Sequence, residues 1–132
     1  MSAKVSDELA SLTVKEAKVK HANPEEAAVL KARAWLDSAV VRRLEAREEQ
    51  GTNMRTYDVY FSAEGKLVFL LLTDAEGDKK TEARFYFDKT GTKLVKWIGA
   101  DKEEVPKDSH DFKDFGDELV KDAKSFKRPF AK

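Results

Sequence analysis

Two segments of the chain repeat one short hairpin pattern. Residues 60–68 have the sequence Tyr-Phe-Ser-Ala-Glu-Gly-Lys-Leu-Val, and residues 86–95 have Tyr-Phe-Asp-Lys-Thr-Gly-Thr-Lys-Leu-Val, with one inserted threonine. This pattern is typical of a type I turn whose last residue is left-handed, so Gly65 and Gly91 are predicted to have positive φ. Connections this short join only antiparallel neighbours. The repeat therefore predicts a sheet built from consecutive hairpins.

Four apolar or alternating runs follow one another between residues 55 and 101, which is typical of strands. The runs cover residues 56–62, 66–75, 79–88 and 93–101. Short polar clusters that contain glycine separate them. We therefore predict a four-stranded antiparallel meander over residues 56–101, with strand order 1-2-3-4.

Residues 24–50 have the start, the spacing and the end of a long helix. Asn23 is a suitable cap, Pro24 suits the first helical position, and Glu26 completes a capping box. Apolar residues then recur at spacings of three, four and seven. Gly51 supplies a C-terminal cap. These signals predict a helix over residues 24–50.

The two ends of the chain fit a helix to different degrees. Residues 1–22 indicate either a weak helix or a mobile lead-in. Residues 109–128 predict an amphipathic helix that Ser109 or Asp108 caps and Pro129 ends. Its apolar stripe is Phe112, Phe115, Leu119, Ala123 and Phe126. The predicted fold is thus one α+β domain over residues 1–132, in which a long helix packs on a four-stranded antiparallel meander and a C-terminal amphipathic helix closes it.

The pairing around the first turn predicts which side chains share a face of the sheet. The predicted pairs are Phe61 with Leu67, Val59 with Phe69, and Tyr57 with Leu71. The same face of the second hairpin holds Ala83, Phe85, Phe87, Leu94 and Ile98. We expect this face to be the core and the helix of residues 24–50 to cover it.

The reverse face of the predicted sheet is too apolar for a solvated surface. It holds Tyr60, Val68, Leu70, Leu72, Tyr86, Val95 and Trp97. Each large apolar side chain left in water forfeits about 1.5 to 3 kcal/mol, so something must cover this face. Three occupants remain open: the C-terminal helix or the N-terminal segment, a second copy of the protein in a homodimer, or a ligand.

If the reverse face binds a partner, we expect Tyr60, Leu70, Tyr86 and Trp97 at its centre, because aromatic groups dominate binding hot spots. Arg84 is expected beside Trp97, where it can stack on the indole and attract an acidic group. The predicted function is a non-enzymatic binding module for a protein or a small apolar ligand. The alternative is a small hydrolase or isomerase, which needs a buried carboxylate or histidine in a pocket between helix and sheet.

Composition argues against several classes of function. The chain contains no cysteine, which excludes disulfides, thiolate metal sites and cysteine nucleophiles. Basic and acidic residues each total 25, and the resulting zero net charge argues against a nucleic-acid partner. The longest apolar run, residues 67–72, is far shorter than the roughly 20 residues that span a bilayer, so no membrane span is expected.

No sequence motif predicts a catalytic or cofactor site. His21 and His110 are the only histidines, and neither lies in a cluster with metal-ligand spacing. There is no Gly-rich phosphate loop, nucleophile elbow or zinc spacing. We therefore assign no catalytic residue, no metal ligand and no cofactor.

Through the repeated Tyr-Phe-x-x-x-Gly-(x)-Lys-Leu-Val unit, residues 56–101 resemble small bacterial cell-envelope proteins built from such hairpins. A helix followed by an antiparallel meander also resembles small modules of the PepSY and beta-lactamase-inhibitor-protein type, which bind other proteins. The resemblance implies a binding role and a periplasmic or envelope location, and it supplies no functional residue. The chain departs from it by lacking a signal peptide, a lipidated cysteine and a disulfide. A cytoplasmic location therefore remains open, as does removal of a signal peptide.

Overall fold

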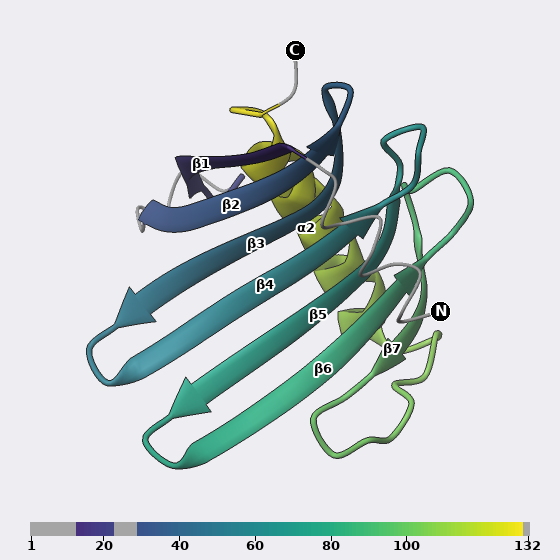
Figure 1. Ribbon diagram of the computed structural model, residues 1–132. Helices are drawn as coiled ribbons and strands as arrows, with labels where there is room; N and C mark the ends of the chain where they lie inside the picture. Colours follow the sequence, from purple (N-terminus) through teal and green to yellow (C-terminus); the bar gives the residue numbers. More distant parts are fainter. Residues whose placement is uncertain (1–12, 23–28, 131–132) are drawn as a thin grey trace, which may run out of the picture.

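A computed structural model describes residues 13–22 and 29–130 of the chain. Seven strands form one antiparallel sheet in sequence order, and a helix lies across one of its faces (Figure 1). The elements are β1 (Thr13–Lys20), β2 (Val29–Asp37), β3 (Val40–Gln50), β4 (Asn53–Phe61), β5 (Leu67–Glu76), β6 (Lys79–Phe87), β7 (Leu94–Ile98) and α2 (His110–Lys127). The fold is α+β, as predicted, but the sheet is larger than expected.

The antiparallel order of the three hairpins from β4 to β7 was predicted correctly, whereas the β3–β4 hairpin, which turns at Gly51, was not. β4 to β7 pair antiparallel in sequence order. Gly65 and Gly91 have φ of 82° and 72°, the left-handed conformation that glycine tolerates best. The C-terminal helix is also present, and the Ser109 hydroxyl accepts a hydrogen bond from the backbone N–H of Phe112 as its cap.

The prediction of a helix over residues 24–50 was wrong. The structure places β2 and β3 there, joined by a turn in which Ser38 and Ala39 both have positive φ. The side chains of Val29–Asp37 alternate between exposed and largely buried, a period of two that fits a strand and not a helix. The N-terminal capping residues of the predicted helix, Asn23, Pro24 and Glu26, lie outside the described residues, and Gly51, its predicted C-terminal cap, lies in the turn between β3 and β4.

The number of strands was also wrong, because the sheet has seven strands and not four. β1 occupies part of the segment 1–22, which was predicted as a weak helix or mobile lead-in. β1 and β4 flank β2 and β3, so the backbone groups of residues 29–50 are paired from both sides. Pairing with neighbouring strands therefore outweighs the local helical pattern.

A β-bulge in the first glycine hairpin changes the predicted faces. Phe61 pairs with Leu67 as predicted, but the register then shifts and leaves Val68 without a partner. Val59 consequently pairs with Leu70 and not with Phe69. A shift of one residue moves every following side chain to the other face, because side chains of a strand alternate.

The second glycine hairpin contains the same irregularity. The register shifts between Tyr86 and Phe87, and Val95 is the extra residue. As a result Trp97 pairs with Phe85 on the face that α2 covers, and Ile98 lies on the other face. The predicted assignment of Ile98 to the core and of Trp97 to the reverse face was therefore wrong.

The core lies between α2 and the sheet. It contains the inward side chains of the strands and the apolar stripe of the helix, with Phe85, Phe126, Leu30, Leu44 and Leu70 among the most deeply buried. Trp97 is partly buried and packs against Phe115 of α2, with ring centroids 5.2 Å apart. The C-terminal helix thus covers the face that holds Leu70, Leu72 and Trp97.

No helix in the described part of the chain is both long and apolar enough to cross a membrane.

Candidate binding face

The face of the sheet opposite α2, here called the open face, has no second helix over it within residues 13–22 and 29–130 (Figure 1). One row of directly paired residues crosses this face from β2 to β7. The row consists of Trp35, Arg43, Tyr60, Phe69, Tyr86 and Lys96. We call these six residues the aromatic row.

Arg43 links the first two rings of the aromatic row. Its guanidinium carbon lies 4.6 Å from the ring centroid of Trp35 and 5.5 Å from that of Tyr60, within the range of a cation–π attraction. Asp58 orients Arg43, because Nε and Nη2 of the arginine donate to the two carboxylate oxygens at 2.9 and 3.0 Å. The same hydrogen bonds raise the pKa of Arg43. A fixed positive charge therefore lies between two aromatic rings.

The other half of the aromatic row consists of rings in mutual contact. The Phe69 centroid is 5.9 Å from that of Tyr60 and 5.0 Å from that of Tyr86. Lys96 Nζ lies 5.9 Å from the Tyr86 centroid. Tyr86 is 37 % exposed, more than the other two rings. Burial raises the pKa of Tyr60, and the neighbouring Asp58 charge adds to this effect.

Three hairpins at the same end of the sheet supply the rings in the same way. Trp35, Tyr60 and Tyr86 each stand directly before a register shift near a turn. The hairpin around Trp35 shares this register shift with the two glycine hairpins but turns differently, since Ser38 and Ala39 both have positive φ. The shared position of the shift places the three aromatic side chains in one line.

The structure brings together three of the five predicted binding residues. Tyr60 and Tyr86 belong to the aromatic row, and Arg84 is exposed on the same face, paired with Leu71 and Ile98. Their role in binding stays a prediction.

The other two predicted binding residues lie on the covered face. Leu70 is fully buried, and Trp97 packs beneath α2. The predicted stacking of Arg84 on Trp97 is not formed, because neighbouring strands place these side chains on opposite faces. The bulge at Val95 causes this difference.

Sequence reasoning missed four residues of the aromatic row. Trp35 and Arg43 lay inside the predicted helix, Phe69 was assigned to the core face, and Lys96 was not predicted as a binding residue. The alternation of Leu30, Ala32, Ala34 and Leu36 was a signal that could have placed Trp35 on the surface of a strand.

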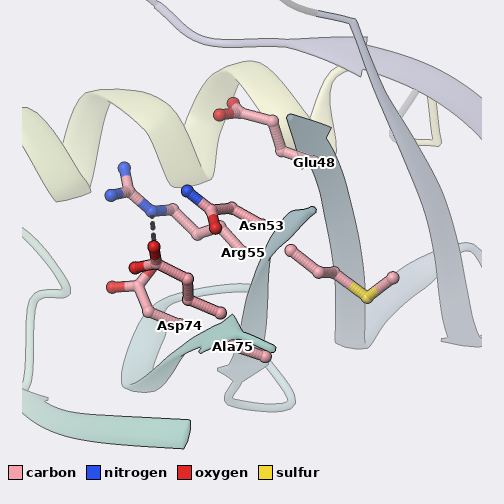
Figure 2. Close-up of a pocket in the computed structure, with 7 residues that line it drawn as sticks. Glu48, Asn53, Arg55, Asp74 and Ala75 are labelled. Carbon is pink, nitrogen blue, oxygen red and sulfur yellow. Dashed lines mark hydrogen bonds and ion pairs between the residues drawn. The ribbon is translucent and has the colours of Figure 1, made fainter. Parts of the chain in front are cut away.

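A polar cavity of about 200 Å³ lies at the opposite end of β4 and β5 from their hairpin (Figure 2). It is lined by Glu48, Asn53, Met54, Arg55, Asp74, Ala75 and Glu76. Figure 2 shows the Arg55 guanidinium turned toward Asp74, and its Nε donates to Asp74 Oδ1 at 2.8 Å. This hydrogen bond raises the pKa of Arg55. Arg55 is therefore already paired within the cavity.

His21 forms a buried polar cluster that the sequence did not indicate. Its Nε2 lies 2.6 Å from Glu48 Oε1, and its Nδ1 lies 3.2 Å from Asp122 Oδ2. A neutral imidazole donates from only one nitrogen, so this geometry requires either an imidazolium or a protonated carboxyl group. The partners are 27 and 101 residues away in sequence, which leaves no local motif to detect.

The cluster joins three elements and is packed among rings. The Ala22 N–H also donates to Asp122 Oδ1 at 2.9 Å, which ties α2 to the end of β1. Tyr57 packs edge-on against His21, with centroids 5.6 Å apart. Burial raises the pKa of Tyr57 to about 12, and the charges of Asp122 and Glu48 contribute. An enzyme that used this cluster would need a cavity that reaches it. Of the three side chains His21, Glu48 and Asp122, only Glu48 is among the described residues that line the cavity in Figure 2.

The chain matches no family model, and comparisons with curated proteins and with solved structures find no match. The resemblance of the hairpin repeat to envelope proteins therefore stays an expectation from the sequence.

Proposed function

We propose that this protein is a binding module that docks another protein on its open face. The observation that supports this proposal is the aromatic row, which presents rings and cations side by side across six strands. Aromatic residues and arginine are enriched at protein interfaces and dominate their hot spots. Because Arg43 and Phe69 already pack against their neighbours, binding would immobilise few additional rotamers.

The extent of the row favours a protein over a small apolar ligand. Strands lie about 4.8 Å apart, so a row across six strands extends over roughly 24 Å. Small-molecule sites are concave and enclose most of the ligand. The cavity in Figure 2 lies at the ends of β3 to β5 and does not include the row. A long, shallow strip of rings fits a patch of protein surface better.

A photo-crosslinking amino acid at position 86 tests this proposal in cells that produce the protein. The matched control carries the same group at position 113, an exposed site on α2. We expect one discrete adduct from position 86 and none of that mass from position 113. The partner identified in this way, once purified, should bind the Tyr86→Ala variant at least about tenfold more weakly than the wild type, a loss of about 1.4 kcal/mol.

An adduct of twice the chain mass would identify the partner as a second copy of the protein, still docked on the open face. The same adducts at both positions, or unchanged affinity of Tyr86→Ala for the purified partner, would contradict the proposal.

A further inference from the structure

A second row on the open face consists of like charges. Lys18 of β1 pairs directly with Lys31 of β2, and Lys31 pairs directly with Arg47 of β3. We call these three residues the cationic row. Side chains directly opposite each other in an antiparallel sheet lie about 5 Å apart at Cβ, and like charges there destabilise the sheet. This arrangement costs stability unless an anion offsets it.

The neighbouring carboxylates neutralise only Arg47 of the cationic row. Glu16 accepts a hydrogen bond from Arg33 at 3.0 Å, and Glu45 forms an ion pair with Arg47 at 3.0 Å. Lys18 and Lys31 form no ion pair with any residue in the described ranges. Two exposed lysines are therefore left without a counter-charge from those residues.

A groove of about 530 Å³ connects these charges. Its polar lining consists of Lys18, Lys31, Arg33 and Arg47 with the carboxylates Glu16 and Glu45. Four cations face two anions, although the whole chain has zero net charge. The groove therefore has room and charge for two carboxylates of a ligand.

The spacing between the two rows defines the shape of that ligand. Lys31 and Trp35 lie four residues apart on one face of β2, and Arg47 and Arg43 lie four residues apart on one face of β3. Four residues of extended chain span about 13 Å. An extended peptide that runs along the strands would therefore meet both rows with side chains at positions i and i+4.

We propose that the open face binds an extended acidic segment of the partner protein, with carboxylates over the cationic row and aromatic side chains over the aromatic row. This inference rests on the proposed function and specifies the chemistry of the partner. Glu16, Arg33, Glu45 and Asp58 occupy the row between the cationic row and the aromatic row, so three of its four residues are carboxylates. A dense polyanion would lie against these carboxylates, whereas a peptide can place its negative charges on the cationic row alone.

Three synthetic ten-residue peptides, titrated into isotope-labelled protein and followed by NMR, test the inference. The first carries a pair of glutamates and, four positions on, a pair of aromatic residues on a threonine background. The second replaces the glutamates with glutamine, and the third replaces the aromatic residues with threonine. The first peptide should bind about tenfold more tightly than either of the others and shift the amide signals of both rows where they cross β2 and β3.

Charge removal in the protein gives the second arm. The double variant Lys18→Gln, Lys31→Gln should bind the first peptide about tenfold more weakly than the wild type and bind the second peptide with unchanged affinity. The same exchange at two exposed lysines of α2, Lys113→Gln with Lys121→Gln, should change neither affinity. Because the cationic row is repulsive, the Lys18 and Lys31 variant should unfold at the same urea concentration as the wild type or at a higher one.

Two failures can be told apart. If the glutamine peptide binds the aromatic row as tightly as the glutamate peptide, and removal of Lys18 and Lys31 has no effect, the acidic-segment inference is wrong and the proposed function stands. If none of the peptides binds and Tyr86→Ala leaves the affinity for the purified partner unchanged, both are wrong. Tighter binding of inorganic polyphosphate than of the first peptide would overturn the inference in favour of a polyanion.

Discussion

The two faces of the sheet are built from alternate residues of the same strands, yet they differ in what their side chains pack against. Leu70 is fully buried under α2, whereas its neighbours Phe69 and Leu71 are half-buried on the open face. The covered face is packed against a helix, whereas among the described residues the open face is packed ring against ring within itself. The face on which an apolar side chain lies, and not its residue type, therefore decides whether it is part of the core or of the accessible surface.

Truncation of one phenylalanine on each face should give the largest difference. Phe85→Ala removes a fully buried ring that contacts both Trp97 and Phe115, and we expect a loss of about 3 to 5 kcal/mol of unfolding free energy. Phe69→Ala should cost about 1 to 1.5 kcal/mol, because it removes ring contacts without opening a core cavity. Urea unfolding measures both. Equal losses would show that the open face is also core.

Removal of one hydrogen-bonding side chain from each face should give the next largest difference. His21→Ala leaves the carboxylates of Glu48 and Asp122 buried without their shared partner, and we expect a loss of about 3 kcal/mol or more. Arg43→Ala should cost about 1 to 2 kcal/mol, because Asp58 is partly solvated.

The triple variant His21→Ala, Glu48→Gln, Asp122→Asn is the control for the buried cluster. It should be more stable than His21→Ala alone, since no unpaired charge remains buried. If the triple variant were the least stable, lost packing and not charge would explain the effect.

The ends of the sheet offer a smaller test. A Cβ at Gly91 would lie 2.6 Å from the backbone nitrogen of Leu67, so Gly91→Ala combines a clash with a left-handed φ and should cost about 2 kcal/mol or more. Gly77 has a similar φ but open space around it, and Gly77→Ala should cost about 1 kcal/mol. Thermal unfolding of both variants measures the difference. Equal thermal midpoints of the two variants would show that Gly91 and Leu67 are not in close contact.

Tyrosine ionisation should give the smallest signal. The pKa of Tyr57 on the covered face is raised from 10.0 to about 12, chiefly by burial, so the folded protein keeps a proton that the unfolded chain loses. Stability should therefore fall as pH rises through the window from 10 to 12. An ultraviolet titration should show a late phenolate that Tyr57→Phe removes. A titration unaltered by this substitution would contradict the raised pKa.

The sequence predicted the parts of the fold whose signals are local. Gly65 and Gly91 marked their turns, and Ser109 marked the start of α2. The segment 29–50 was mistaken for a helix because residues four apart, such as Leu30 and Ala34, share a face in a helix and in a strand alike. The turn at Ser38 and Ala39 contains no glycine or proline to separate the two strands.

The candidate site was harder to predict from the sequence than the fold. Its face assignments depend on single extra residues, Val68 and Val95, that look like ordinary strand residues. Tyr60, Arg84 and Tyr86 were placed together correctly because they lie before the bulges or away from them. The His21 cluster depends on a contact across 101 residues of chain, which no local pattern encodes.

That long contact has a consequence for how the molecule assembles. Every pairing in the meander joins strands that are adjacent in sequence. Hairpins such as β4–β5 therefore only have to close short loops, and they can form early in folding. The bond between Asp122 and the end of β1 must wait until both ends of the chain meet. We expect pulsed hydrogen exchange during refolding to protect β4 and β5 before α2. A late-docking helix would leave the covered face accessible for a time, and chaperones that recognise apolar surface would meet that face first.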